Sequence, residues 1–309
     1  MSSAPRQDRK PVTLTKLHEM RALGEPIVMI TAYDFPSAQV AEEAGVDVVL
    51  VGDSAANVVL GYDTTVPVTM DEMVMLARAV RRGLRTPLLV GDLPFGSYQV
   101  SDQQAVESAA RFVKEAECEA VKIEMAGVSG GLVDKRESVS RARAIVSAGI
   151  PLMGHVGLTP QSSSALGGHR AQGRTAREAV QVADDALALQ QAGCFAIVFE
   201  AVPAPVAEAV VERLEIPVIG IGAGPATAGQ VLVFHDLLGI YEGHAPRFAK
   251  RFAQLKREMV AGVRAYATEV REGRFPAEEH CYSIDPEELA RFREVVAPGK
   301  AWDVADFIG

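Results

Sequence analysis

The chain has 309 residues, of which 48% are hydrophobic and 23% are charged, a balance typical of a globular protein with a well-buried core. Its formal net charge of −9 argues against nucleic acid or an anionic membrane surface as a partner, because both recruit positive charge. No stretch approaches the roughly 20 apolar residues of a membrane-spanning helix, and residues 1–10 lack the apolar core of a signal peptide.

The cysteine pattern gives an expectation about the compartment. Cys118, Cys194 and Cys281 are far apart and form no CxxC pair. Their odd number and wide spacing are typical of reduced thiols rather than of a disulfide framework or a metal-thiolate site. We therefore expect a cytoplasmic protein.

Taken in chain order, the sequence repeats an apolar β-branched run, a polar or glycine-containing loop, and a segment with helical periodicity. Most runs are almost continuously hydrophobic, which is typical of parallel strands covered on both faces. The expected strands are Ile27–Asp34, Val46–Asp53, Pro87–Pro94, Ala120–Glu124, Pro151–Gly157, Phe195–Val202, Pro217–Gly224 and, with a weaker pattern, Gln230–Phe234.

Amphipathic helices are expected between most of these strands and after the last one. Ser101 and Asp102 are favourable residues at a helix start, and Gly149 and Gly193 are of the type favoured just past a helix end. The expected helical segments are Ser37–Ala44, Met70–Arg82, Ser101–Ala116, Lys135–Ala148, Arg177–Ala192, Pro205–Leu214 and a long helix within Pro246–Glu272.

Eight β-α units indicate either a closed barrel or a doubly wound open sheet. No break in composition separates two halves and no glycine fingerprint follows the first strand, so we predict a (β/α)8 TIM barrel. The glycine-rich segment 220–224 lacks the spacing of a dinucleotide site. It could be a loop that meets an anion or simply a tight turn.

Three parts of the chain are expected: a flexible tail at 1–10, the barrel at 11–274 and a C-terminal helical extension at 275–309. The extension carries one short helical pattern, Pro286–Val296, and an apolar end that includes Trp302 and Phe307. It could cap the barrel or pack on a neighbouring subunit.

Five of the apolar runs end in polar or ionisable side chains. They are Asp53 and Ser54 for the second run, Asp92 for the third, Lys122 and Glu124 for the fourth, His155 for the fifth and Glu200 for the sixth. TIM-barrel enzymes place their active sites at the carboxyl ends of the strands, where such side chains converge.

Each of these residues also has a structural interpretation. Asp53 or Asp92 alone could cap a loop, and Lys122 with Glu124 could form a structural ion pair. His155 could be a hydrogen-bonded core residue, and Glu200 could lie at the rim. All of them are expected at the carboxyl ends of the strands, at the same level along the barrel axis, and this favours a functional site.

Four carboxylates around one lysine need compensation, because like charges in a low-dielectric pocket raise one another's pKa or recruit a cation. Oxygen ligands without a cysteine cluster favour Mg²⁺. We expect Asp53 and Asp92 to be direct ligands and Glu124 either to bind the metal or to hold a metal-bound water.

Such a metal could chelate a 2-oxo acid and stabilise the enolate formed when a proton leaves the neighbouring carbon. Lys122 would neutralise the substrate carboxylate or the enolate charge. Glu200, across the barrel from the aspartates, is the candidate base. The residues alone predict a metal-assisted enolate enzyme and leave its electrophile open.

Several stretches carry a resemblance to a known family. They are ITAYD at 30–34, LVGDSAANVVLGYDTTVPVTMDEM at 50–73, GDLPF at 91–95, VKIE at 121–124, GHVGLTPQS at 154–162, GG…QGR within 167–174, FEAVP at 199–203, IPVIGIGAG at 216–224 and EEH at 278–280. In this ordered set the sequence resembles the ketopantoate hydroxymethyltransferase family from about residue 10 to about residue 280. It departs in the longer loop MAGVSGG after Glu124, in Ser164, where asparagine is common, and in a longer tail beyond His280.

The resemblance implies a barrel of the phosphoenolpyruvate/pyruvate-binding type. It implies Asp53, Asp92 and Glu124 as magnesium-site residues and Glu200 as proton acceptor. The residues implied to contact the oxo acid are Asp53, Ser54, Asp92 and Lys122, with His155 in the same region.

The implied reaction belongs to pantothenate biosynthesis. It deprotonates 3-methyl-2-oxobutanoate and adds the one-carbon unit of 5,10-methylenetetrahydrofolate, giving 2-dehydropantoate. The resemblance also implies a homo-oligomer, a decamer that exchanges C-terminal segments, which is one role for the extension.

Two other interpretations remain. A magnesium-dependent lyase or mutase of the isocitrate lyase and phosphoenolpyruvate mutase type would use a similar site, but many such enzymes carry a KKCGH-type loop that this chain lacks. A non-catalytic barrel would be expected to have lost at least one of the ionisable groups at the strand ends, yet all are present.

Overall fold

The computed structural model describes residues 9–125, 135–162, 170–241, 243 and 246–298. Its eight parallel strands close into a barrel in chain order, and β8 pairs with β1, so the predicted TIM barrel is confirmed. The strands are β1 (Ile27–Thr31), β2 (Val48–Val51), β3 (Leu88–Asp92), β4 (Ala120–Lys122), β5 (Leu152–Gly157), β6 (Ala196–Glu200), β7 (Val218–Ile221) and β8 (Gly229–Leu232).

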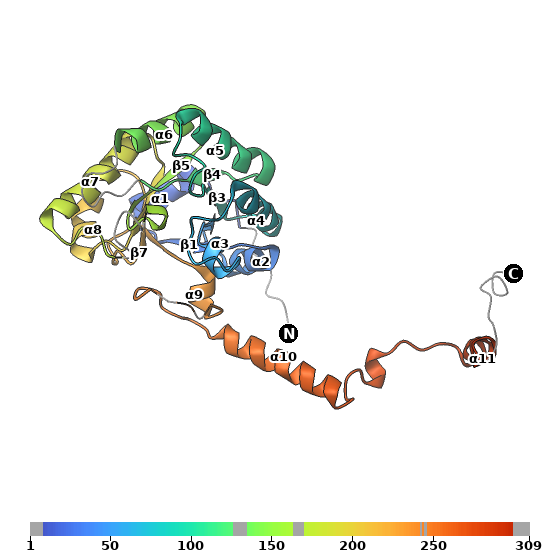
Figure 1. Cartoon of the computed structure of the whole chain (residues 1–309). Coiled ribbons are helices and arrows are strands. Elements are labelled where there is room, and N and C mark those ends of the chain that lie inside the picture. Colours follow the sequence, from blue (N-terminus) through green and yellow to red (C-terminus); the bar gives the residue numbers. More distant parts are fainter. Residues whose placement is uncertain (1–8, 126–134, 163–169, 242, 244–245, 299–309) are drawn as a thin grey trace. The chain divides into compact units, whose positions relative to one another are not determined.

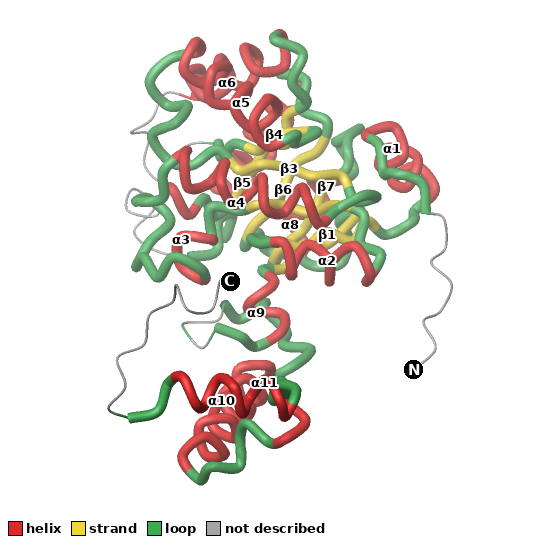
Figure 2. The backbone as a smooth tube through the Cα atoms, turned by 90° about the vertical axis from the view of Figure 1, so that its right-hand side faces the viewer, coloured by secondary structure: helices red, strands yellow, loops and turns green. Residues whose placement is uncertain are grey.

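Helices surround the strands, and Figure 1 shows α2, α4, α5, α6, α7 and α8 following one another around the barrel. The strands lie inside this ring, as the tube view also shows (Figure 2). The helices of this part of the chain are α1 (Leu14–Leu23), α2 (Phe35–Ala44), α3 (Ala55–Val58), α4 (Met70–Gly83), α5 (Asp102–Ala116), α6 (Lys135–Ser147), α7 (Ala176–Gln191), α8 (Ala204–Val211) and α9 (Phe234–Leu238), with a 3₁₀ turn η1 at Pro160–Ser162.

Local sequence explains where several helices begin. The side chains of Thr69 and Thr175 accept hydrogen bonds from the backbone N–H groups of Glu72 and Glu178, and each glutamate carboxylate accepts one from the backbone N–H of its threonine. These capping boxes satisfy backbone donors that a helix start leaves unpaired. They fix the first turns of α4 and α7.

The strands carry two alternating sets of apolar side chains. One buried cluster lies between the strands and the surrounding helices and includes Leu89 and Phe112. A second fills the barrel interior and includes Val48, Val90 and Val198. Because successive strand residues point to opposite faces, every second position belongs to the interior.

Close packing of helices on strands explains two glycines. A Cβ atom on Gly91 would lie 2.5 Å from the ring of Phe112 in α5. Gly222 has φ +68°, and a Cβ there would lie 2.4 Å from the ring of Phe248. The glycines near 220–224 thus permit a tight, closely packed turn, one of the two interpretations of this segment.

Some elements differ from the prediction. Helices α1, α3 and α9 were not expected; α1 contributes Leu17 and Met20 to the interior cluster, so tertiary packing compensates for a weak helical pattern. No helix separates β7 from β8: residues 222–228, all described, form a loop there, and the sequence pattern had indicated no helix at this point. The longer loop after Glu124, Ser164, Trp302 and Phe307 lie largely or wholly outside the described residues.

By its internal contacts the chain divides into two units, 1–254 and 255–309. The second contains α10 (Leu255–Arg271), a 3₁₀ turn η2 (Glu278–His280) and α11 (Pro286–Val295). Helix α10, described throughout, has no buried residue. The expected boundary after 274 stays a prediction. Within the described part of the chain, no helix is long and apolar enough to cross a membrane.

Candidate active site

The polar residues at the strand ends continue the inward-facing series of the barrel. On β3, interior residues Leu88 and Val90 are followed two positions later by Asp92. On β6, Ala196 and Val198 lead in the same way to Glu200. The period of two along a strand therefore aims these side chains into the barrel, at the carboxyl end of the strands.

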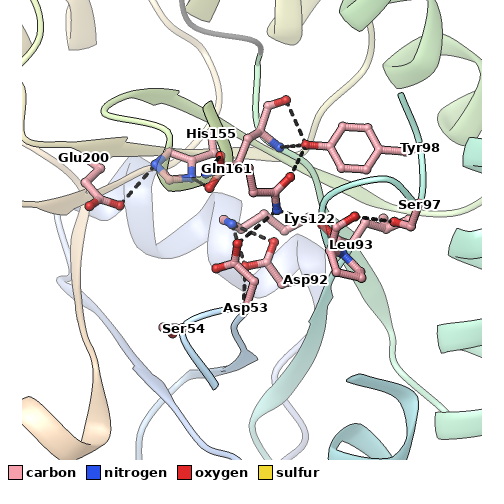
Figure 3. Close-up of polar contacts among 12 residues, drawn as sticks. Asp53, Ser54, Asp92, Leu93, Ser97, Tyr98, Lys122, His155, Gln161 and Glu200 are labelled. Atoms are coloured by element: carbon pink, nitrogen blue, oxygen red, sulfur yellow. Dashed lines mark hydrogen bonds and ion pairs between the residues drawn. The ribbon is translucent and has the colours of Figure 1, made fainter. Parts of the chain in front are cut away.

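The same alternation places Lys122 after Ala120 and His155 after Met153. Glu124 continues the series beyond the end of β4. Asp53, Asp92, Lys122, Glu124 and His155 are all buried, with at most 5% of each residue exposed. The structure therefore brings these predicted residues into one buried cluster (Figure 3).

The centre of the cluster is an ion pair between neighbouring strands. The Nζ atom of Lys122 donates to both carboxylate oxygens of Asp92, at 2.6 and 2.7 Å. The backbone N–H of Asp53 donates to Oδ2 of Asp92 at 3.2 Å. Asp92 thus joins the ends of β2, β3 and β4.

A residue that the sequence did not single out, Gln161, links this pair to the rest of the cluster. Its side-chain amide Nε2 donates to Oδ2 of Asp53 at 3.0 Å, and its backbone N–H donates to Oε2 of Glu124 at 3.0 Å. Its Oε1 accepts from the hydroxyl of Tyr98 at 2.8 Å. Tyr98 was also missed.

His155 lies between two carboxylates. Its Nδ1 is 3.5 Å from Oε1 of Glu124 and its Nε2 is 3.4 Å from Oε2 of Glu200. These separations are longer than good hydrogen bonds. Among the described residues, both ring nitrogens and Oε1 of Glu124 are buried without a hydrogen-bond partner, so a bound ligand or ion would improve their polar contacts.

Glu200 is the most accessible member, since 16% of its side chain is exposed whereas the side chains of Glu124 and His155 are almost fully buried. In Figure 3 its carboxylate lies on the opposite side of the group from Tyr98. A carboxylate that is partly buried and reachable from the barrel mouth suits a proton acceptor.

Burial and like charges shift the pKa values of the cluster. Burial raises the pKa of Asp92 to about 7 even though Lys122 acts to lower it. Burial, followed by the charge of Asp53, raises the pKa of Glu124 well above its usual range. With every carboxylate ionised, the cluster would carry more negative charge than one ammonium group compensates, and Asp92 and Glu124 respond by binding protons more readily than usual.

The two basic residues respond in opposite directions. Burial alone would lower the pKa of Lys122, but the surrounding carboxylates, Asp92 first, outweigh it and raise the pKa. Burial, with the charge of Lys122, lowers the pKa of His155 well below its usual value. At neutral pH Lys122 is therefore charged and His155 is neutral.

The chemistry of the cluster fits a hard cation, because it combines excess negative charge with an unsatisfied buried oxygen on Glu124. Over the described residues, however, no three His, Cys, Asp or Glu side chains are arranged as a metal-binding group. Mg²⁺ commonly takes only one or two carboxylates and completes its shell with water and substrate. The donor set thus fits Mg²⁺ better than a metal held by protein alone.

Ser54 lies beside this cluster rather than in its hydrogen-bond network. In the described part of the chain its Oγ is 2.8 Å from the hydroxyl of the buried Tyr33. In Figure 3 it is drawn apart from the linked carboxylates. The structure therefore supports Ser54 less directly than the other predicted residues.

Comparison with known proteins places this geometry in a family. The family model described as ketopantoate hydroxymethyltransferase matches residues 11–278. The chain belongs to the ketopantoate hydroxymethyltransferase family. The family and the enzyme class, a transferase, that the sequence motifs predicted are both confirmed.

Two relatives illustrate how closely the family is matched. A protein of Carboxydothermus hydrogenoformans named 3-methyl-2-oxobutanoate hydroxymethyltransferase is 50% identical over 280 residues, which cover 91% of this chain and 98% of that protein. The Arabidopsis thaliana protein named 3-methyl-2-oxobutanoate hydroxymethyltransferase 1, mitochondrial, is 49% identical over 294 residues, covering 93% and 82% of the two chains.

Solved structures show a related barrel at much lower identity. A phosphonopyruvate hydrolase in complex with oxalate and Mg²⁺ has a TM-score of 0.57 at 15% identity, covering 93% of this chain and 99% of that chain. A 2,3-dimethylmalate lyase, described as a member of the PEP mutase/isocitrate lyase superfamily, has a TM-score of 0.56 at 20% identity, with 90% and 93% covered. At this identity the likeness shows the fold alone, so it does not favour the lyase or mutase interpretation over the family.

Sequence reasoning missed Gln161 and Tyr98 for a physical reason. Gln161 lies inside the GHVGLTPQS stretch, but no charge or spacing distinguishes it from its neighbours. Tyr98 reaches the cluster from the loop after β3, and only the folded chain brings its hydroxyl to Glu124. Neutral partners of charged groups carry little signal in a single sequence.

Proposed function

We propose that the chain transfers a hydroxymethyl unit from 5,10-methylenetetrahydrofolate to 3-methyl-2-oxobutanoate, giving 2-dehydropantoate, with Mg²⁺ as cofactor. Membership of the family supports the substrate and product. The observation that carries the mechanism is the buried acidic cluster around Lys122 with the more accessible Glu200 beside it.

Asp53 and Asp92 would hold Mg²⁺, with Glu124 as a further ligand or as the partner of a bound water. When bound, the metal supplies positive charge that attracts the carboxylate and keto oxygens of the oxo acid and stabilises negative charge developing on them. The excess charge of the cluster and the unsatisfied oxygen of Glu124 support this assignment.

Lys122 is charged and fixed by Asp92, so its ammonium group would neutralise negative charge on the substrate without having to reorganise. Glu200 would accept the proton from C3 of the oxo acid. His155 is neutral and stands between Glu124 and Glu200, so it would separate the two carboxylates and orient Glu200 without competing for that proton.

The electron pair left at C3 then forms a carbon–carbon bond to the one-carbon unit carried by the folate. The net reaction takes up one water, whose oxygen becomes the new hydroxyl group, and releases tetrahydrofolate. Because C3 carries the only proton next to the keto group, its loss can be measured separately from the transfer.

The test follows that proton. Purified protein is incubated with 3-methyl-2-oxobutanoate in D₂O with Mg²⁺ or EDTA, with and without 5,10-methylenetetrahydrofolate, and the C3 proton is observed by NMR. We expect metal-dependent exchange without folate and 2-dehydropantoate only with it.

Glu200→Gln removes the proton acceptor and should slow both exchange and transfer, by roughly 10²- to 10⁴-fold. Glu208→Gln, an exposed glutamate on α8, is the matched control and should react like the wild type. Absence of both exchange and product with wild-type protein under all conditions would overturn the proposal and direct attention to lyase substrates.

We also infer that the protein is a homo-oligomer, a decamer as the resemblance implies, and that it is cytoplasmic. No residue of α10 or α11 is buried, and all of their residues are described, which supports a further contact for this unit. Light scattering coupled to size-exclusion chromatography tests the oligomeric state.

A further inference from the structure

We infer that Gln161 is a positioning residue, which sets the geometry of the acidic cluster by holding Asp53 and Glu124 with neutral hydrogen-bond donors. The inference rests on the proposed function, since it assigns Gln161 a role in the reaction proposed above. No property of the isolated residue suggests this role; its contacts do.

Gln161 joins four segments that leave the ends of different strands. It lies in η1 after β5, and its side chain reaches Asp53 after β2 and the carbonyl oxygen of Leu93 after β3, both at 3.0 Å from Nε2. Its backbone N–H reaches Glu124 beyond β4. Gln161 is 5% exposed, so water cannot readily replace these bonds.

The surroundings fix which way the amide group points. A carboxylate of Asp53 and the carbonyl of Leu93 can only accept hydrogen bonds, so the NH₂ end must face them. Oε1 then faces Tyr98, whose hydroxyl accepts from the backbone N–H of Glu124 at 3.2 Å and donates its own proton to Gln161. Every polar atom of the side chain is satisfied in this orientation alone.

A neutral amide suits this position better than a charged group would. A second ammonium beside Lys122 would neutralise the cluster and weaken its attraction for a cation. A carboxylate would add repulsion to Asp53 and could donate only when protonated. The amide donates to Asp53 while leaving the total charge of the cluster unchanged.

The consequence is a prediction for substitutions that keep shape but remove hydrogen bonding. Gln161→Met retains the length and apolar contacts of the side chain, while Gln161→Glu replaces the NH₂ donor with an oxygen. Loss of a partner that orients metal ligands typically lowers metal affinity or activity about 10- to 100-fold. We expect the loss of C3 exchange in both variants to fall within this range, because neither variant keeps the NH₂ donor that orients Asp53.

The chain offers a matched control. Gln181 in α7 donates from Nε2 to Oδ1 of Asp185 at 3.0 Å, the same distance as between Gln161 and Asp53, but outside the strand-end cluster. Gln181→Met therefore removes the same type of hydrogen bond without touching the proposed machinery. It should change thermal stability slightly and leave catalysis unchanged.

The experiment measures three quantities for each full-length variant: thermal unfolding, Mg²⁺ affinity by isothermal titration calorimetry, and C3 proton exchange at saturating Mg²⁺ and 3-methyl-2-oxobutanoate. A positioning role predicts that Gln161→Met remains folded, loses Mg²⁺ affinity and exchanges more slowly even at saturation. Equal Mg²⁺ affinity and exchange in Gln161→Met and Gln181→Met would overturn it.

Two further results keep the outcomes separate. If Gln161→Met does not fold, Tyr98→Phe takes its place, because it removes only the hydroxyl that orients the amide. It must then show a smaller loss of Mg²⁺ affinity and of C3 exchange than the range given above. Unchanged Mg²⁺ affinity and exchange in Tyr98→Phe would overturn the inference. If wild-type protein binds Mg²⁺ but shows no exchange, the proposed function fails, and the Mg²⁺ affinity of Gln161→Met still decides the role of Gln161.

Discussion

Replacing Lys122 by methionine tests the electrostatic description of the cluster. Methionine fills a similar volume but leaves Asp92, Asp53 and Glu124 without the ammonium group that contacts Asp92 at 2.6 and 2.7 Å. Breaking a buried ion pair by removing one partner costs about 3–5 kcal/mol of unfolding free energy. We expect a loss of this size at pH 8, together with loss of activity.

The pH dependence of that loss gives the sharper test. A carboxyl group whose pKa is raised on folding binds a proton in the folded state, so stability falls as pH rises from the ordinary value to the raised one. For wild-type Asp92 that window runs from 3.8 to about 7. Without Lys122, which lowers the pKa of Asp92, the window extends to higher pH.

The difference in unfolding free energy between wild type and Lys122→Met should therefore be larger at pH 8 than at pH 6. For one group the excess is about 1.4 kcal/mol, since one additional pH unit of proton uptake is involved. Urea unfolding followed by circular dichroism, at one protein concentration, measures it. Lys114→Met, an exposed position on α5, is the control. An equal difference at both pH values would refute the reasoning.

Two other substitutions test the packing and the connections of the barrel. Gly91→Ala would place a methyl group 2.5 Å from the ring of Phe112 and should lower the unfolding free energy by about 1–3 kcal/mol. It should also displace Asp92 and so slow C3 exchange. Unchanged thermal unfolding would contradict this. Glu42 accepts hydrogen bonds from Arg85 N–H, Thr86 N–H and Thr86 Oγ1, and although burial acts to raise its pKa, these bonds lower it. Glu42→Gln should therefore lower the unfolding free energy by about 1–3 kcal/mol at pH 7. This difference from the wild type should vanish as pH falls from 4.5 through the lowered folded pKa, because the wild-type carboxylate then becomes protonated as well. Urea unfolding measures the difference, and a difference that persists in acid would contradict the assignment.

The barrel and most of its candidate site could be predicted because both depend on strong local signals. Continuous apolar runs marked the strands, and a charged residue at the end of such a run, such as Asp92 or Glu200, is conspicuous. The contributions that could not be predicted are non-local. The hydrogen bond from Gln161 to Asp53 joins residues 108 positions apart. Helix α1 is stabilised by the interior cluster to which it contributes side chains.

The surface against which the last helix packs was also not predictable from local sequence. The last long helix, expected within Pro246–Glu272, begins at Leu255 and belongs to the second unit, because helical periodicity alone does not say against which surface a helix packs. Its apolar side chains include Met259, Val263 and Tyr266, which are all exposed, although the ring of Tyr266 contacts Phe275.

Closure of the strands in chain order, with β8 returning to β1, has a consequence for the order of folding. The last pairing brings Thr31 to the backbone N–H of Phe234, 203 residues away in sequence. Asp53, Asp92 and Glu124 follow the consecutive strands β2, β3 and β4, so they can meet in a partly assembled barrel, whereas Glu200 on β6 joins them fully only as the ring closes. A divalent cation that binds only the closed ring would accelerate the final assembly step little, but would strongly slow its reversal.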